Sequence, residues 1–215
     1  MWKYGDSWEK YPINEGEIWK ELVTSSILSV CDIRKELPNF ILDNIDMVYC
    51  DPPWSRENVN AFITKAEMNT YIKDFREFYE IFFKRISQIN PRVCYLEIGK
   101  KNKEIFEGEL SKIFPYINFW KITYYKTHPC YLLRGSFDLK KPFDFTGKDE
   151  ENIPMISIKI ENPKNIADLC TGRGLTAIAA FKQKISFRGT ELNKRRLAVT
   201  IDRVNSLGGY YRKLL

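Results

Sequence analysis

Short apolar runs alternate with helical patterns along this chain, and that alternation limits its fold more than any other feature. Continuous apolar runs bounded by polar residues, Gly or Pro are typical of buried strands, and they occur at 26–33, 47–51, 92–99, 165–170 and 185–192. Helical patterns lie between them, at 67–88, 102–114, 174–183 and 193–206. Residues 117–137 read as two strands around a turn. The order predicts an α/β fold: a mostly parallel sheet with an antiparallel edge hairpin and helices on both faces.

Aromatic residues repeat at a helical spacing within 67–88. They are Tyr71, Phe75, Phe78, Tyr79 and Phe82. Such a stripe is more typical of a helix face packed on a core than of a binding surface. We therefore expect this segment to be one helix that covers a face of the sheet.

The composition is that of a globular protein. The chain has 215 residues, of which 44% are hydrophobic and 29% charged, and this fits one domain over 1–215. No apolar run is long enough to cross a membrane, and the first residues lack the layout of a secretory signal. We expect a cytoplasmic protein. The five cysteines form no Cys-x-x-Cys pair and His128 is the only histidine, so neither a metal site nor a disulfide framework is expected.

Charge is unevenly distributed along the chain. The formal net charge is +6, yet residues 1–50 hold five Lys/Arg against nine Asp/Glu, and residues 182–215 hold nine Lys/Arg against two Asp/Glu. A basic segment is what a polyanion-binding surface needs. An ordinary solvated helix face has the same composition, so both interpretations stay open at this point.

A glycine turn follows the apolar run at 165–170. The sequence Thr171-Gly-Arg-Gly-Leu-Thr176 leads directly into a helical pattern, and Glu191 ends the next expected strand, 19 residues after Gly172. Glycines at such a turn let the backbone approach a ligand closely, and an acidic side chain at the next strand end can accept hydrogen bonds from ribose hydroxyls. The pattern predicts a site for a nucleoside-containing cofactor. A tight turn with a surface glutamate is the alternative.

A rigid tetrapeptide, Asp51-Pro52-Pro53-Trp54, follows the run at 47–51. Two consecutive prolines exclude a helix and hold the segment extended. At the carboxyl edge of a sheet it would present a carboxylate, peptide carbonyls and an indole face. Those groups suit a planar base that carries an exocyclic amine, although a purely structural turn would also fit.

The two motifs together resemble those of the S-adenosylmethionine-dependent amino-methyltransferases of DNA. CDPPW matches the family's D-P-P-W form of catalytic loop, and ADLCTGRGLTAIAAF resembles its D-x-F-x-G-x-G-T-T-x-x-A-A cofactor loop. RGTELNKRR resembles the second cofactor motif, and SVCDIRKELPNFILDNIDMVYCDPPW resembles the family's "G-D … L-P … D-L-V-Y-T-D-P-P-Y" segment. The catalytic loop precedes the cofactor loop, which is similar to the circularly permuted β class. The resemblance implies a Rossmann-like methyltransferase fold, circularly permuted.

The resemblance also implies roles for individual residues. The catalytic residues would be Asp51, Pro52, Pro53 and Trp54. The cofactor, S-adenosyl-L-methionine, would be bound by Asp32, Ile33, Cys50, Asp168, Cys170, Thr171, Gly172, Gly174, Thr176, Glu191 and Asn193. Substrate contacts would come from Trp54, Tyr124, Tyr125, His128, Tyr131, Arg134 and Arg173.

The implied reaction is methyl transfer to N6 of adenine in DNA, with the base flipped out of the duplex. Three alternatives stay open: an RNA adenine-N6 methyltransferase, a DNA cytosine-N4 methyltransferase, and a non-catalytic nucleic-acid-binding subunit of the same fold. WKITYYKTHPCYLLRGSF loosely resembles a segment of the messenger-RNA adenine methyltransferases, whose motif order differs.

The chain departs from the family pattern in several places. Cys170 stands where Phe is usual and Arg173 where Ser is usual. Residues 1–25 form an N-terminal extension, and only 136–152 is available where relatives carry a target-recognition domain. We therefore expect loose or very short sequence specificity, or specificity supplied by a homodimer or a partner subunit. A small, loosely specific enzyme would suit a phage or mobile element that protects its genome, and the expected location is the cytoplasm of a bacterial or phage-infected host cell.

Overall fold

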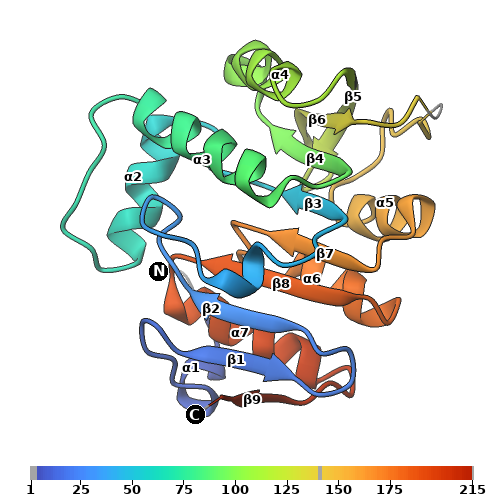
Figure 1. Ribbon diagram of the computed structural model, residues 1–215. Helices are drawn as coiled ribbons and strands as arrows, with labels where there is room; N and C mark the ends of the chain where they lie inside the picture. Colours follow the sequence, from blue (N-terminus) through green and yellow to red (C-terminus); the bar gives the residue numbers. More distant parts are fainter. Residues whose placement is uncertain (1–3, 140–141, 215) are drawn as a thin grey trace.

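The protein is described by a computed structural model that covers residues 4–139 and 142–214 (Figure 1). Over these residues the centre is a nine-stranded sheet with helices on both faces. The strands are β1 (Ile18–Glu21), β2 (Ile27–Val30), β3 (Met47–Cys50), β4 (Val93–Ile98), β5 (Tyr116–Tyr124), β6 (His128–Ser136), β7 (Asn165–Asp168), β8 (Ser186–Glu191) and β9 (Tyr211–Lys213). The α-helices are α1 (Ser7–Lys10), α2 (Arg56–Lys65), α3 (Arg76–Ile89), α4 (Lys103–Ser111), α5 (Ile153–Glu161), α6 (Leu175–Lys182) and α7 (Lys194–Asn205), with short 3₁₀ turns at Asn39–Ile41 and Lys100–Asn102.

The strand order is β5-β6-β4-β3-β7-β8-β2-β1-β9. The five strands from β4 to β2 are parallel to one another. At one edge, β6 pairs antiparallel with β4 and with β5, which confirms the predicted hairpin at 117–137. At the other edge, β1 pairs antiparallel with both β2 and β9. The predicted α/β fold with a mostly parallel sheet is confirmed.

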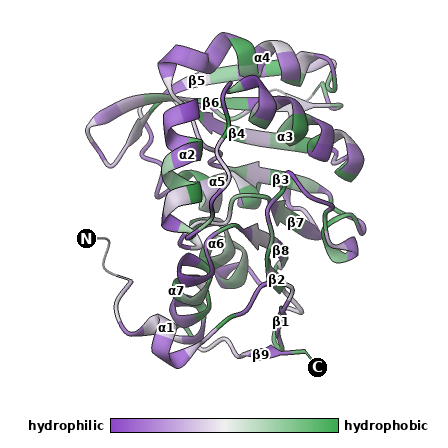
Figure 2. Ribbon diagram, turned by 90° about the vertical axis from the view of Figure 1, so that its left-hand side faces the viewer, coloured by the Kyte–Doolittle hydropathy of each residue, from purple (hydrophilic) through white to green (hydrophobic). Residues whose placement is uncertain are grey.

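Alternating side chains of the strands divide the core into two halves. On one face, residues such as Val48 and Cys50 pack with α2, α3 and α4. On the other face, Met47 and Tyr49 pack with α5, α6 and α7. Figure 2 shows helices on both sides of the sheet, with hydrophilic residues along α1 and α7. The parallel strands are therefore apolar throughout because both of their faces are buried.

The helix predicted at 67–88 begins at Arg76 instead. The side chain of Glu77 accepts hydrogen bonds from the backbone N–H groups of Lys73 and Asp74, at 3.0 and 2.9 Å, and so caps the helix start. Before that, Asn60 holds the backbone of Ile72 through two hydrogen bonds. Tyr71 consequently lies outside the helix and is 59% exposed, whereas Phe78 and Phe82 of the predicted stripe are buried.

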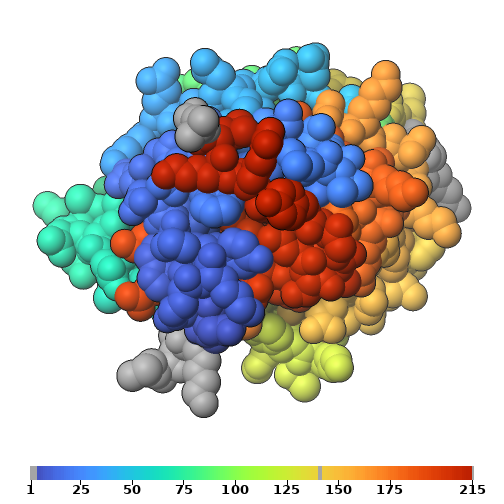
Figure 3. Space-filling model, turned by 90° about the horizontal axis from the view of Figure 1, so that it is seen from below, coloured from blue at the N-terminus to red at the C-terminus, as the bar shows by residue number. Residues whose placement is uncertain are grey.

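The predicted N-terminal extension at 1–25 supplies β1, an inner strand near one edge of the sheet. Because β1 pairs with β9, the N-terminal and C-terminal parts of the chain lie side by side at this end of the molecule (Figure 3). The short segment at 136–152 forms turns beyond β6, and its residues 140 and 141 lie outside the described residues. No helix among the described residues has the length and apolarity needed to cross a membrane.

Candidate active site

A cavity of about 640 Å³ lies where the parallel strands end. Loops after β2, β3 and β7 line it, together with Glu191 at the end of β8. The carboxyl ends of parallel strands meet at one edge of a sheet, so residues distant in sequence converge there. The cavity therefore brings the tetrapeptide 51–54 and the glycine turn 171–174 to one place.

The tetrapeptide is fixed by hydrogen bonds from its own tryptophan and from the edge hairpin. Trp54 Nε1 donates to Asp51 Oδ1 at 2.9 Å, and Tyr124 OH donates to Asp51 Oδ2 at 3.3 Å. Asn102 Nδ2 donates to the carbonyl of Trp54 at 2.7 Å. The indole lies against the backbone of Gly99, where a Cβ would come within 2.7 Å of it. Asp51 is thus held in a single orientation toward the cavity.

Two aromatic rings stand beside this carboxyl group. The ring centroids of Trp54 and Tyr124 are 4.9 Å apart, at an interplanar angle of 61°. Tyr125 also lines the cavity, and its ring centroid lies 4.4 Å from that of Tyr124. Aromatic faces next to a carboxylate are suited to a planar base whose polar edge points at the carboxylate.

The pKa of the Asp51 carboxyl is higher than usual. Burial raises its pKa to about 6, although hydrogen bonds from Trp54 and Tyr124 and the charge of Arg196 act in the opposite direction. The group is therefore mostly ionised at pH 7 and above. It can accept hydrogen bonds there from an amine.

The glycine turn begins after β7. Gly172 and Gly174 have φ angles of +59° and +83°, in the left-handed region that favours glycine. A Cβ on Gly174 would meet Thr200 of α7 at 2.5 Å, so glycine is also required there for packing. The turn lies against the cavity and ends where α6 begins.

Glu191 joins this turn to the start of α7. Its Oε2 accepts from the backbone N–H of Gly172 at 2.7 Å, and its Oε1 accepts from that of Asn193 at 2.9 Å. Each carboxylate oxygen keeps a second lone pair for a ligand. This arrangement fits the two hydroxyls of a ribose.

The remaining cavity wall fits the other parts of a nucleoside that carries an amino acid. Val59, Phe62 and Ile63 form an apolar wall from α2. Asp168 accepts from the backbone N–H of Cys170 at 2.9 Å, and burial raises its pKa to about 7. Such a carboxyl, facing the cavity, suits a cationic group of a ligand.

Eight of the eleven residues predicted to bind the cofactor line the cavity. They are Asp32, Ile33, Asp168, Cys170, Thr171, Gly172, Thr176 and Glu191. Asp32 is already engaged, since Arg34 donates to both of its carboxylate oxygens at 2.7 to 3.1 Å.

The other three predicted cofactor residues do not line the cavity but lie next to residues that do. Cys50 accepts from the backbone N–H of Leu169 through its Sγ. Asn193 caps α7 and donates from Nδ2 to the carbonyl of Lys65. Gly174 is in the turn beneath the cavity.

Of the predicted substrate contacts, Trp54, Tyr124, Tyr125 and Arg173 line the cavity. The others do not. His128 is exposed at the start of β6, and Tyr131 is half-buried beside Phe119.

The prediction that Arg134 contacts substrate is wrong. Arg134 is only 1% exposed and forms an ion pair with Glu161 at 2.9 Å, and its Nε donates to Tyr95 OH at 3.1 Å. It pairs with Tyr95 across β4 and β6, and that register turns its side chain into the core. The sequence pattern of one strand does not reveal which partner a buried arginine will meet.

Sequence reasoning missed several cavity residues. They include Tyr49, Glu97, Glu150, Arg196 and Arg203. The clearest signal was Glu97, a single acidic residue inside the apolar run 92–99. Within the described part of the chain, no group of three or more His, Cys, Asp or Glu side chains could hold a metal ion.

Comparison with known proteins identifies the fold. No family model and no curated protein sequence matches the chain. Among solved structures, M1.HpyAVI matches with a TM-score of 0.57 and 13% identity, over 82% of this chain and 97% of that one. TTHA0409 of Thermus thermophilus, assigned as a DNA modification methylase, gives 0.57 and 15%, over 83% and 94%.

Two further matches add chemical information about those proteins. A structure of TTHA0409 complexed with S-adenosyl-L-methionine matches with a TM-score of 0.54 and 14% identity, over 83% of this chain and 93% of that one. The PvuII DNA methyltransferase, cytosine-N4-specific, matches with a TM-score of 0.57 and 9% identity, over 90% and 95%. The chain therefore has a methyltransferase fold.

Proposed function

We propose that this protein is a DNA methyltransferase that transfers a methyl group from S-adenosyl-L-methionine to N6 of a flipped adenine. The observation that carries the proposal is the Asp51 carboxylate, held by Trp54 and Tyr124 in the cavity that also contains the glycine turn and Glu191. The relatives in fold that are described as DNA methylases support the same chemistry. The order of the two loops along the chain supports the circularly permuted β class.

The chain's residues divide the cavity between two ligands. Glu191 would hold the ribose of the cofactor, with the glycine turn against its amino-acid part and Val59, Phe62 and Ile63 beside its adenine. When bound, S-adenosyl-L-methionine supplies an electrophilic methyl group on its sulfonium. The tetrapeptide 51–54 would hold the base that accepts it.

An exocyclic amine of a base is a weak nucleophile because its lone pair is delocalised into the ring. Asp51 and the carbonyl of Pro52 would accept the two amine hydrogens, which localises the lone pair and stabilises the positive charge that develops during attack. Trp54 would stack on the base and hold the nitrogen in line. No covalent enzyme intermediate is needed, so none of the cysteines has a role in bond making.

Cytosine-N4 is the second candidate acceptor, favoured by the match to a cytosine-N4-specific enzyme. Both bases offer the same amine to Asp51, and the D-P-P form of the loop favours adenine by resemblance. RNA is a further candidate substrate, because a flipped or unpaired base is reached in the same way.

Nucleic acid would approach over the cavity mouth. Four arginines line the cavity, namely Arg34, Arg173, Arg196 and Arg203. Arginine is well suited to phosphate contact. The segment 136–152 is short, so a homodimer or a partner subunit would be needed for a long recognition sequence.

The decisive experiment measures transfer of labelled methyl from S-adenosyl-L-methionine to duplex DNA, single-stranded DNA and RNA. Nucleoside digestion and mass spectrometry then identify the product. We expect N6-methyladenine in DNA with the wild type and none with Asp51→Ala, while calorimetry shows that both bind the cofactor. N4-methylcytosine, or label only in RNA, would replace the proposed substrate. Absence of both transfer and cofactor binding would overturn the proposal.

A further inference from the structure

Glu97 is a second carboxyl at the floor of the active-site cavity. It lies in β4, is only 2% exposed and lines the same cavity as Asp51. Tyr49 of β3 pairs with Tyr95 of β4 in the parallel register, so the next residues on that face, Asp51 and Glu97, follow side by side. The sheet itself therefore places these two carboxyl groups next to each other.

One oxygen of Glu97 is already engaged. Tyr49 OH donates a hydrogen bond to Glu97 Oε1, and Tyr49 is itself buried and stacked on Tyr95. In the described part of the chain, this is the hydrogen bond that the Glu97 carboxyl makes. Its orientation is thus fixed by the core, while Oε2 is left for a ligand.

The surroundings of Glu97 act strongly on its protonation. Burial, and then the neighbouring charge of Asp51, raise the pKa of Glu97 well above its usual range. Glu150 and Asp168 act in the same direction, and only the hydrogen bond from Tyr49 opposes them. Its surroundings therefore favour the protonated form of Glu97, which can donate a hydrogen bond. A protonated carboxyl beside one that accepts hydrogen bonds gives the site both a donor and an acceptor.

We propose that Glu97, held by Tyr49, reads the target base by donating a hydrogen bond from Oε2 to the ring nitrogen next to the exocyclic amine. This rests on the proposed function, in which Asp51 accepts from that amine. An acceptor beside a donor matches the edge of adenine, N6 and N1, and equally that of cytosine, N4 and N3. Guanine, thymine and uracil present a carbonyl and a ring N–H at these positions, so the pair excludes them. Glu97 is then a specificity-determining residue.

The test removes the two partners of this hydrogen bond separately and together. We would measure kcat/KM for wild type, Glu97→Leu and Glu97→Gln on oligonucleotides that carry one target adenine or 1-deazaadenine, which has C–H in place of N1. If cytosine is the base that is methylated, 3-deazacytosine replaces it. A hydrogen bond in a dry site contributes about 1–3 kcal/mol, so we expect the kcat/KM of the wild type to fall by roughly 5- to 150-fold on the deaza substrate.

The kcat/KM of Glu97→Leu on adenine should be lower than that of the wild type by a similar factor. Replacing adenine with 1-deazaadenine should then lower the kcat/KM of this variant no further. Glu97→Gln keeps the shape and an N–H donor, and should stay within about 5-fold of wild type. Glu150→Gln is the matched control, since it changes another acid of the same cavity and should leave the adenine-to-deazaadenine ratio unchanged. Should Glu97→Leu fail to fold, Tyr49→Phe takes its place in the comparison, because it removes the bond that orients Glu97.

The assignment is supported if Glu97→Leu and the deaza substrate each lower kcat/KM by a similar factor, and if combining them lowers it no further. Independent losses that multiply would overturn it and leave Glu97 as a structural partner of Tyr49, while wild-type activity would still uphold the proposed function. A wild type that methylates no nucleic acid overturns the proposed function, and this assignment falls with it.

Discussion

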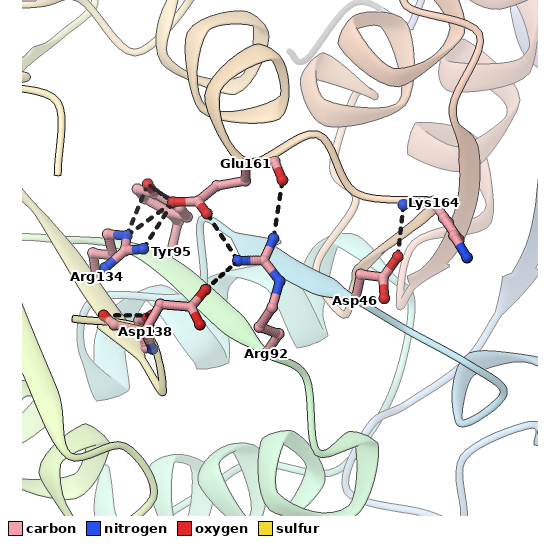
Figure 4. A network of polar contacts seen from close by, with 8 residues as sticks. Asp46, Arg92, Tyr95, Arg134, Asp138, Glu161 and Lys164 are labelled. Carbon is pink, nitrogen blue, oxygen red and sulfur yellow. Dashed lines mark hydrogen bonds and ion pairs between the residues drawn. The ribbon is translucent and has the colours of Figure 1, made fainter. Parts of the chain in front are cut away.

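At the two ends of the central sheet, the pKa values of buried carboxyl groups are shifted in opposite directions. At the amino ends of the strands, Glu161 accepts from Arg134, Tyr95 and Arg92 (Figure 4). Burial alone would raise the pKa of Glu161, yet the hydrogen bonds from Arg134 and Tyr95 and the charge of Arg134 bring it below its usual range. At the carboxyl ends, burial raises the pKa of Asp51 to about 6.

The difference indicates at which end the buried carboxyl groups find their partners within the fold, and at which end a ligand would supply them. A buried charge is tolerated only when it is paired or coordinated. The network of Arg92, Arg134 and Glu161 meets that need within the chain and ties β4, β6 and α5 together. In the cavity, burial raises the pKa values of Asp51, Glu97 and Asp168, and the charge of Asp51 raises those of Glu97 and Asp168 further. Raised pKa values of this kind are typical of groups placed for binding or catalysis.

The largest expected effect comes from removing the charge in the cavity. Asp51→Asn should reduce methyl transfer by roughly 1000-fold, because the amide no longer stabilises the charge that develops on the amine. The melting temperature should not fall, since the variant removes a buried ionisable group with no ion pair in the described chain. Single-turnover kinetics and thermal unfolding measure the two quantities. A melting temperature below that of the wild type would mean that Asp51, like Glu161, stabilises the fold.

The second expected effect is on stability, at the opposite end. Arg134→Met leaves the Glu161 carboxylate buried with a weaker set of partners, which costs about 3 kcal/mol. At about 2–4 °C per kcal/mol, the melting temperature should fall by roughly 6–12 °C. Activity at 20 °C should change by less than about 2-fold.

The control for this variant is Arg134→Met combined with Glu161→Gln, which removes the stranded charge and should recover part of the loss. Loss of activity without loss of stability in Arg134→Met would mean that the network acts on the cavity.

Sequence reasoning located the elements whose structure is decided locally. The tetrapeptide 51–54 and the turn at Gly172 lie at strand ends because prolines and glycines determine the backbone there. What it missed depends on pairing between distant segments. The register of β3 on β4 places Glu97 beside Asp51, and the register of β6 on β4 buries Arg134. Strands β1 and β9 were not predicted for the same reason. Each is short, and each is held in the sheet by pairing with its neighbours.

The third prediction uses pH to separate the two ends. Asp51 and Asp168 have folded pKa values of about 6 and about 7, above their value of 3.8 in a model peptide. The folded state therefore binds these protons more tightly than the unfolded state, and their contribution to stability is lost as pH rises from about 4 through the folded pKa values. The unliganded protein should therefore have a lower melting temperature at pH 8 than at pH 5.

Asp51→Asn should flatten that slope, and Arg134→Met should leave it unchanged. The pKa of Glu161 is lowered, so its contribution is present above about pH 4.5 and is lost only in more acidic solution. Calorimetric melting at each pH supplies the data. A melting temperature that rises toward pH 8 would contradict raised pKa values in the cavity.

The smallest expected effect concerns the helix that borders the cavity. Asn193 Oδ1 accepts from the backbone N–H groups of Arg195 and Arg196 and so caps α7. Asn193→Ala should cost about 1 kcal/mol, or roughly 2–4 °C in melting temperature. Asn193→Asp keeps the cap oxygen and loses the bonds that Nδ2 donates to the carbonyl of Lys65 and to Tyr4 OH, so it should retain most of the stability. Cofactor affinity, measured by calorimetry, should fall by only a few-fold in both variants, since the backbone N–H of residue 193 still orients Glu191. A much larger loss in Asn193→Ala would mean that the cap, and not the glycine turn, holds Glu191 in its binding position.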